Sequence, residues 1–226
     1  MANSARPIVF IGGGSLAIEA AAYLLALDAA DRLACIVDHR GGRAEDFATL
    51  LGRPVPVVPD AGGLADIAGH DLLICFGDPH LRWRTWRELQ PLGPRFTTIV
   101  HPAAVICRTA EIGAGSIVGP FVFVGPFVTV GANAVLNVRA TIGHDAVVGH
   151  SAVLSPHCDM NGHSAIGEAA FLGAGAILSP SAKLGHFAKL SAGSVLNKVA
   201  QDGDLMHGNP ASGRKMFPVP ADFQAD

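Results

Sequence analysis

One histidine in this sequence stands beside a carboxylate in a setting suited to proton transfer. His144 lies in Ile142-Gly143-His144-Asp145. Attack of an amine or a hydroxyl on a thioester needs a base that works near neutral pH, and imidazole is the side chain with that property. A neighbouring carboxylate stabilises the imidazolium that forms. The sequence predicts His144 as a general base supported by Asp145; a solvated surface histidine is the alternative.

A second candidate site is the segment Gly12-Gly13-Gly14-Ser15-Leu16-Ala17, which follows a predicted strand. It satisfies G-x-G-x-x-[GA], a turn that lets phosphates approach a helix N-terminus. Asp38 ends the second predicted strand, where a carboxylate can bind a ribose hydroxyl. A tight turn without a ligand is one alternative, and NAD is a second. Because four predicted strands are fewer than the six of a full dinucleotide-binding sheet, a single nucleotide, as in a nucleotide sugar, fits better.

The expected ligand contacts come from three loops that follow predicted strands, because open parallel sheets bind ligands at the carboxyl ends of their strands. Arginine forks suit phosphates, and Arg82 is the best placed arginine before residue 98. Trp83 and Trp86 are expected to pack inside the protein rather than stack on a base. The predicted substrate contacts are Gly12, Gly14, Ser15, Leu16, Asp38, His39, Arg40, Gly77, Asp78 and Arg82.

The elements that position these residues differ between the two halves of the chain. From Val100 to Leu196 every sixth residue is aliphatic, over seventeen consecutive units, and the residue four places later is small, or Val or Cys. This period predicts a solenoid in which each hexapeptide forms one side of a triangular coil. Three units make a coil, so residues 18 apart stack at the ~4.8 Å spacing of neighbouring strands. Gly, Asn and Ser near the corners suit tight turns. His144 then lies at a corner, with Gly162 one coil above it.

The residues before 98 lack this period. Apolar runs at 8–11, 33–37, 72–76 and 96–100 are typical of buried strands, and helices are expected at 16–27, around 47–51 and at 81–89. Alternating strands and helices favour a parallel sheet with covering helices. The predicted fold class is an α/β N-terminal domain (small Rossmann-like parallel sheet), residues 1–97, followed by a parallel β-helix domain with a C-terminal tail, residues 98–226.

Composition excludes several classes of protein. The 226 residues are 50% hydrophobic and only 15% charged, which rules out a disordered chain. A net charge of −3 gives no bulk attraction to nucleic acid or to an anionic membrane. The four cysteines form no CxxC pair, so reduced thiols in a cytoplasmic protein are expected. No segment is long and apolar enough to be predicted to span a bilayer.

The repeat and the segment Leu136–Asp145 resemble the hexapeptide-repeat bacterial sugar acyltransferases of the PglD and NeuD type. The resemblance covers nearly the whole chain, including the ending Gly208-Asn209-Pro210-Ala211. It implies a left-handed β-helix, acetyl-CoA as co-substrate and a homotrimer with the acceptor cleft between subunits. Exposed apolar residues would need cover in such a trimer, in particular Phe121, Phe123 and Phe127.

The same resemblance implies roles for single residues. His144 would be the general base, Asp145 would tune it, and Asn137 would belong to the active site. Acetyl-CoA contacts are implied at Val153, where the family has a second histidine, and at Ala174 and Ala192.

These features predict an acetyl-CoA-dependent N-acetyltransferase that acts on a UDP-, dTDP- or GDP-linked amino sugar of the 4-amino-4,6-dideoxy type, by direct attack of the amine on the thioester. The alternatives are an O-acetyltransferase of the sialic-acid type and an NAD-binding or structural solenoid. His150, Glu168 and His186 share a column at steps of 18. The His-x4-His pair that marks zinc-binding solenoids of the gamma-class carbonic anhydrase type is absent, so no metal is expected.

Overall fold

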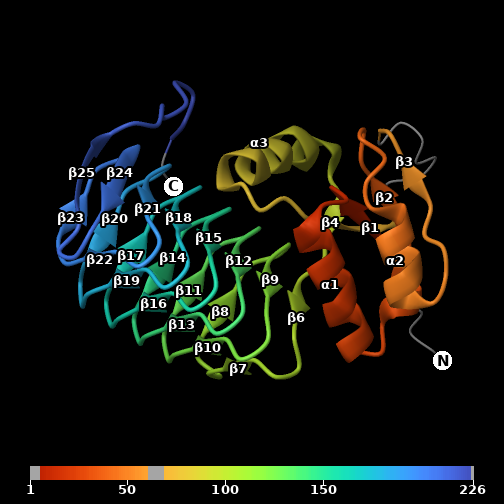
Figure 1. The fold of residues 1–226 in the computed structure, drawn as a ribbon, viewed down its shortest axis with the longest axis horizontal. Helices are drawn as coiled ribbons and strands as arrows, with labels where there is room; N and C mark the ends of the chain where they lie inside the picture. Colours follow the sequence, from red (N-terminus) through yellow and green to blue (C-terminus); the bar gives the residue numbers. More distant parts are fainter. Residues whose placement is uncertain (1–5, 61–68, 225–226) are drawn as a thin grey trace.

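The computed structural model describes residues 6–60 and 69–224, and it joins a parallel sheet flanked by helices to a three-sided solenoid of short strands (Figure 1). The pairings in the N-terminal sheet are all parallel, as predicted. In spatial order the sheet holds β3 (Val57–Val58), β2 (Leu33–Val37), β1 (Ile8–Ile11), β4 (Asp71–Ile74) and β5 (Arg95–Phe96).

Helices cover both faces of this sheet. The α-helices are α1 (Ser15–Ala26), α2 (Ala44–Leu51) and α3 (Pro79–Leu89), and two 3₁₀ turns are η1 (Ala30–Arg32) and η4 (Gln90–Leu92). Strand side chains alternate between faces. Phe10 of β1 therefore packs in the cluster that holds α1 and α2, whereas Val9 packs with Trp86 of α3. The expected fold class is confirmed, and each helix lies where the sequence predicted it.

Two strands of the N-terminal region differ from the prediction. β3 was not expected, because two valines at the sheet edge are too short a run to show a period. The expected strand at 96–100 is in fact two strands. β5 ends at Phe96 in the N-terminal sheet, and β6 (Ile99–Val100) belongs to the solenoid. One apolar run thus supplies two sheets, which a pattern of hydrophobicity does not reveal.

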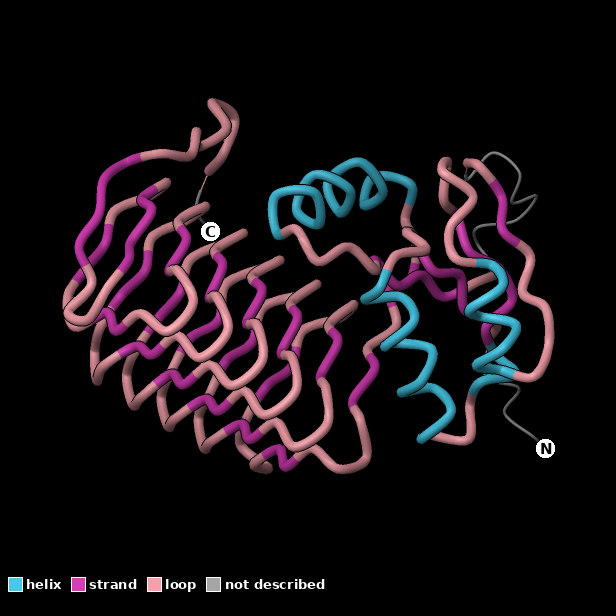
Figure 2. The backbone as a smooth tube through the Cα atoms, in the orientation of Figure 1, coloured by secondary structure: helices cyan, strands magenta, loops and turns pink. Residues whose placement is uncertain are grey.

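In the solenoid, every third strand pairs in parallel, so each side of the prism is one sheet (Figure 2). The first face holds β6, β9 (Ile117–Val118), β12 (Val135–Leu136), β15 (Val153–Leu154), β18 (Phe171–Leu172), β21 (Lys189–Leu190), β24 (Asp204–His207) and the antiparallel β25 (Ser212–Lys215). The second face holds β7 (Val105–Ile106), β10 (Phe123–Val124), β13 (Thr141–Ile142), β16 (Asp159–Met160), β19 (Ile177–Leu178) and β22 (Val195–Leu196). The third face holds β8 (Glu111–Ile112), β11 (Thr129–Val130), β14 (Val147–Val148), β17 (Ala165–Ile166), β20 (Lys183–Leu184) and β23 (Val199–Ala200).

The repeated aliphatic residues form the core of the solenoid. Ile142 pairs with Val124 on one side and with Met160 on the other, 18 residues away in each direction. From Val118 to Leu196 these side chains are at most 2% exposed. Burial of one such side chain stabilises the fold by roughly 1.5–3 kcal/mol. The register of 18 residues and the inward aliphatic positions are confirmed.

The glycine that follows many of these aliphatic residues has a different cause from the one expected. Gly143 does not have a positive φ; instead, a Cβ there would lie 2.9 Å from the backbone nitrogen of Gly162 in the next coil. The left-handed turn residue comes two places later, at Asp145, with φ of 57°. Glycine is therefore selected after Ile142 by the close approach of the neighbouring coil.

The repeat ends earlier than the sequence suggested. Val199 of β23 pairs with Lys183, only 16 residues away, because the last corner contains two residues fewer than the others. Ala200 thus takes the inward strand position rather than the place of a small residue four after Leu196.

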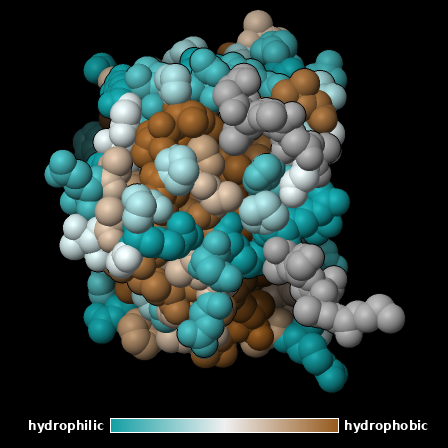
Figure 3. Space-filling model, turned by 90° about the vertical axis from the view of Figure 1, so that its right-hand side faces the viewer, coloured by the Kyte–Doolittle hydropathy of each residue, from teal (hydrophilic) through white to brown (hydrophobic). Residues whose placement is uncertain are grey.

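The N-terminal region packs against the first face of the solenoid, and the C-terminal segment closes over the junction. Tyr23 of α1 shares a buried cluster with Ile117, Val135 and Val153. Asp222 forms an ion pair with Arg87 of α3 at 2.5 Å. Apolar side chains also reach the surface at the N-terminal end of the molecule (Figure 3). Among the described residues, no helix has the length and apolar character needed to cross a membrane.

Candidate active site

His144 projects from the corner between β13 and β14, on the edge where the second and third faces meet (the second–third edge). Its Nδ1 lies 2.8 Å from a carboxylate oxygen of Asp145. The side chains are 57% and 43% exposed, respectively, so substrate-sized molecules can reach the pair. If Nδ1–H donates to Asp145, the lone pair on Nε2 is free to accept a proton.

The coil above provides the seat for the His144 ring. A Cβ at Gly162 would lie 2.6 Å from Nε2, so only glycine leaves room for the imidazole in this position. The ring of His163 stands perpendicular to that of His144, with centroids 5.0 Å apart. The sequence identified Gly162 through the period of 18. The same period placed His163 in a column with Asp145, but it did not indicate the contact between the rings of His163 and His144.

A cation could in principle meet several ligands at this corner. Within the described ranges, His144, Asp145 and His163 form a group whose ligand atoms lie within 4.8 Å of one another, and all three are exposed. In the column of His150, Glu168 and His186 that the sequence suggested, side chains form hydrogen bonds within the protein. His186 Nδ1 accepts a hydrogen bond from the Glu168 backbone N–H at 3.1 Å, and Glu168 accepts one from the Trp83 indole at 3.2 Å.

The structure does not bring the other predicted active-site residues to His144 within one chain. Asn137 lies at the opposite end of β13, on the edge between the first and second faces, and its Oδ1 accepts a hydrogen bond from the Val138 backbone at 2.7 Å. Ala174 and Ala192 are exposed on that same edge. Their coils stack directly, since Gly193 N–H donates to the Ala174 carbonyl at 2.9 Å.

Val153 does not have the place expected of a cofactor contact. Its side chain is 5% exposed and packs in the apolar cluster between the first face and α1. The prediction for this residue therefore needs correction, because it relied on alignment with a polar family position and not on packing.

The glycine loop and two further loops converge at the carboxyl ends of β1, β2 and β4, which are neighbours in the sheet. Gly14 precedes the first turn of α1 and offers no side-chain cap to its N–H groups. Ser15 accepts a hydrogen bond from Arg43 at 3.3 Å, a residue that sequence reasoning missed. The predicted contacts thus lie together: Gly12, Gly14, Ser15 and Leu16 after β1, Asp38, His39 and Arg40 after β2, and Gly77 and Asp78 after β4.

Asp38 already has protein partners in this loop cluster. Its carboxylate accepts hydrogen bonds from the backbone N–H groups of Gly13 and Arg40, each at 2.8 Å. Burial raises the pKa of Asp38, but the N–H groups of Gly13, Arg40 and Gly42 outweigh it, and the net pKa lies below its ordinary value. Asp38 holds the glycine loop against the loop after β2 in addition to any contact with a ribose.

Arg82 has a structural role rather than the ligand contact that was expected. The side chain is fully buried. Its guanidinium donates to the carbonyls of Ile74, Phe76 and Asn133 and to the Asn133 side chain, at 2.5 to 3.1 Å. Arg82 therefore ties α3 and β4 to the solenoid. The sequence placed Arg82 near the end of a strand, but its burial depends on Asn133, which lies 51 positions further along the chain.

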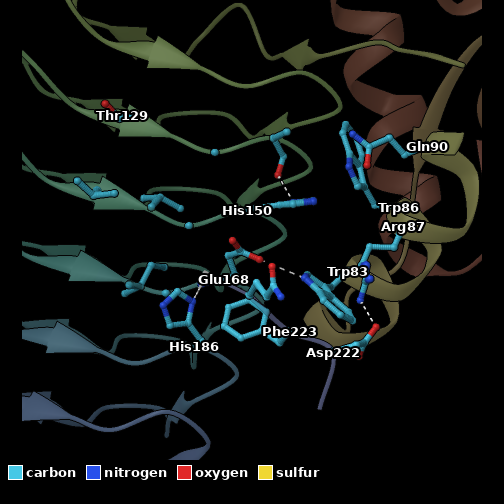
Figure 4. A pocket seen from close by; sticks show the side chains of 18 residues that line it. Trp83, Trp86, Arg87, Gln90, Thr129, His150, Glu168, His186, Asp222 and Phe223 are labelled. Carbon is cyan, nitrogen blue, oxygen red and sulfur yellow. Dashed lines mark hydrogen bonds and ion pairs between the residues drawn. The ribbon is translucent and has the colours of Figure 1, made fainter. Parts of the chain in front are cut away.

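A cavity of about 830 Å³ lies elsewhere, between α3, the third face and the C-terminal segment (Figure 4). His150, Glu168 and His186 point toward it, opposite Trp83 and Trp86. Both tryptophans are nearly buried, as predicted. His144 instead borders a second cavity of about 690 Å³ on the second face. The His144–Asp145 pair, rather than cavity size, makes the smaller of these two cavities the candidate active site.

Cys158, the cysteine next to His157, is not an activated nucleophile. All four are free, and Cys158 is buried inside the solenoid. Burial raises the pKa of its thiol to about 11, so the thiolate is scarce at neutral pH.

A β-helix with a histidine–carboxylate pair on an open edge, joined to a small sheet with a glycine loop, defines a hexapeptide-repeat acyltransferase. A scan against protein-family models found no match, and a search of curated proteins found none. Solved structures are similar over almost the whole chain. A histidine-to-asparagine variant of perosamine N-acetyltransferase from Caulobacter crescentus, in complex with CoA and GDP-perosamine, is 30% identical, with 92% of this chain and 96% of that chain covered and a TM-score of 0.83.

PerB from Caulobacter crescentus, in complex with the same two molecules, is 29% identical over 92% of this chain and 97% of its own, with a TM-score of 0.82. The acetyltransferase domain of PglB from Neisseria gonorrhoeae shares the fold, at 23% identity over 93% of this chain and 100% of that domain, with a TM-score of 0.82. The chain belongs to the family of hexapeptide-repeat sugar N-acetyltransferases.

Proposed function

We propose that this protein transfers the acetyl group of acetyl-CoA to the amino group of a nucleotide-linked sugar, with His144 as general base. The His144–Asp145 pair on the second–third edge carries the proposal. The relative from Caulobacter crescentus binds CoA and GDP-perosamine, so a GDP-linked amino sugar is the first acceptor to test.

In the proposed reaction, the amine nitrogen attacks the thioester carbonyl while Nε2 of His144 accepts the amine proton. Asp145 stabilises the imidazolium through Nδ1–H. A backbone N–H of a neighbouring coil would stabilise the oxyanion. The carbon–sulfur bond then breaks, and the imidazolium returns the proton to the departing CoA thiolate. The buried Cys158 supports direct transfer without an acyl-enzyme.

The separation of Asn137 from His144 supports a site shared between subunits. Both residues flank β13, so they can share one site only if a second chain brings one edge against the other. Exposed phenylalanines surround this face, at Phe121, Phe123 and Phe127, with 61%, 40% and 64% exposure. Three second faces packed around a threefold axis would cover them and would join the Asn137 edge of one protomer to the His144 edge of the next.

The test is thiol release from acetyl-CoA in the presence of GDP-, UDP- and dTDP-linked 4-amino sugars, with free sialic acid as a hydroxyl acceptor. We expect release with a nucleotide-linked amino sugar and an N-acetyl product by mass spectrometry. Release with sialic acid alone would favour O-acetylation. Absence of release with every acceptor would contradict the proposed activity, and a thermal shift with NAD but not with CoA would favour the NAD-binding alternative.

A further inference from the structure

Two successive coils place three possible metal ligands at the corner that carries the predicted base. His144, Asp145 and His163 each offer one ligand atom, and these atoms lie within 4.8 Å of one another. Two imidazoles and a carboxylate suit Zn²⁺, which binds nitrogen and oxygen ligands at about 2.0–2.2 Å. The side chains at this corner therefore match the donor set of a zinc site.

The stacking of the coils holds the backbone of these three residues in place. The backbone N–H of His163 donates to the carbonyl of His144 at 3.0 Å, and that of Asp145 donates to the carbonyl of Pro126 at 3.0 Å. Asp145 and His163 have left-handed backbones with φ of 57° and 59°, so both corners turn in the same way. A metal ion thus meets ligands on a fixed backbone and does not have to order a loop.

Only small movements of side chains are needed to complete the site. A tetrahedral zinc ion holds its ligands about 3.4 Å apart. One pair already lies closer, since Nδ1 of His144 is 2.8 Å from the Asp145 carboxylate. The imidazole of His163 has to approach by no more than roughly 1.5 Å. All three side chains are exposed, so they can rotate without disturbing the core.

The surroundings of this corner favour a cation. His144 and His163 line the cavity of about 690 Å³ on the second face, which leaves room for water as a fourth ligand. The carboxylate of Asp159 lines the same cavity, and the described residues around the cavity include no arginine or lysine. The nearby charge is therefore negative, which attracts a divalent cation.

Coordination removes the basic nitrogen of His144 whichever ring nitrogen binds the metal. In a neutral imidazole one nitrogen has a lone pair, and the other carries the proton. If the metal takes the lone pair of Nε2, that nitrogen can accept no proton. If the metal takes the lone pair of Nδ1, the proton lies on Nε2, with the same result.

We propose that His144, Asp145 and His163 form a binding site for Zn²⁺ and that the bound ion inhibits acetyl transfer by occupying the base. The metal is an inhibitor and supplies no step of the reaction. The inhibition rests on the proposed function, since it takes His144 as the base, whereas metal binding depends only on the three side chains of this corner.

Metal binding is tested by calorimetric titration of the full-length protein, without an affinity tag and freed of metal, with zinc chloride. We expect one site per chain and at least tenfold weaker binding for His163→Ala, since even loss of a residue that only supports a ligand costs roughly ten- to a hundredfold in affinity. His157→Ala is the matched control and should bind as the unchanged protein does. That histidine is exposed on a corner of similar backbone, with φ of 61°, but lies outside the group. Absence of zinc binding, or the same affinity for both variants, would overturn the site.

Inhibition is measured as initial formation of the N-acetyl product by mass spectrometry, because the thiol of released CoA also binds zinc. Zinc at a free concentration near the measured Kd should halve the rate, and EDTA should restore it. His163→Ala, compared with its own rate without zinc, should need at least tenfold more zinc for the same loss. Mg²⁺ prefers oxygen ligands and should not inhibit.

Two results separate the possible failures. Zinc that binds at this corner without slowing the reaction would contradict the inhibition. Failure of the proposed function has a different signature, because the unchanged protein would then form no product even without zinc, while the titration would still report on the metal site.

Discussion

In the solenoid, inward side chains up to Leu196 stack on residues 18 positions away, as Ile142 does on Met160, whereas in the N-terminal sheet Val9 pairs with Cys35 on one side and with Leu72 on the other. Contacts between neighbouring coils repeat the same local rule, so one period specifies most of the solenoid core. The sheet depends on pairings at several different separations, and its loops carry the substrate-binding candidates. Under the proposed function, the solenoid carries the base, whereas the loops of the N-terminal region bind the nucleotide-linked acceptor.

The sharpest test of this division is removal of the base. His144→Ala should lower kcat by about 100- to 10,000-fold, the range for loss of a general base. Thermal unfolding and nucleotide-sugar binding should stay unchanged, because the side chain is exposed and lies on the solenoid edge. The measurement is steady-state thiol release beside a thermal melt. Full turnover by this variant would remove His144 from the mechanism.

Arg82 tests how the two regions are joined. Arg82→Ala should destabilise the protein by about 3 kcal/mol, because it leaves buried carbonyls and Asn133 without a donor. Urea unfolding, followed with separate probes for the two regions, should show transitions that move apart. Arg84→Ala is the control: its side chain is 66% exposed and its ion pair with Glu88 is worth less than about 1 kcal/mol. Similar losses for both variants would contradict a special role for Arg82.

Gly162 tests whether a neighbouring coil positions the base. Gly162→Ala places a methyl group 2.6 Å from Nε2 of His144, so the ring has to move. We expect kcat to fall by about ten- to a hundredfold, with little change in the melting temperature. Pro180→Ala, one coil further along the same edge, should have near-normal kcat. An active Gly162→Ala variant would show that the ring position is not needed.

Asp38 gives the smallest expected effect. Because the pKa of its carboxyl is lowered, the charged form stabilises the loop at pH values above the ordinary pKa of 3.8. This contribution to stability is lost as the pH falls through the folded-state pKa, which lies below 3.8. Asp38→Asn should lower the melting temperature slightly at pH 7, and the difference from the unchanged protein should vanish in acid. A difference independent of pH would argue against the charge as its cause.

The sequence by itself was sufficient to predict the repeat and its register. Aliphatic residues such as Ile142 recur every sixth position, and only a coil of three hexapeptides buries all of them on one axis. The same period located Gly162 above His144. The glycine loop after β1 could also be predicted, because a strand, a glycine turn and a helix follow one another in sequence.

Only the tertiary structure showed which residues are buried by contact between the two regions. Arg82 and Val153 are buried where a loop and an alignment suggested ligand contacts, because each packs against residues far away in sequence. A local period determines which way a side chain points within its coil, but the partners that surround it are set by how the sheet docks on the solenoid.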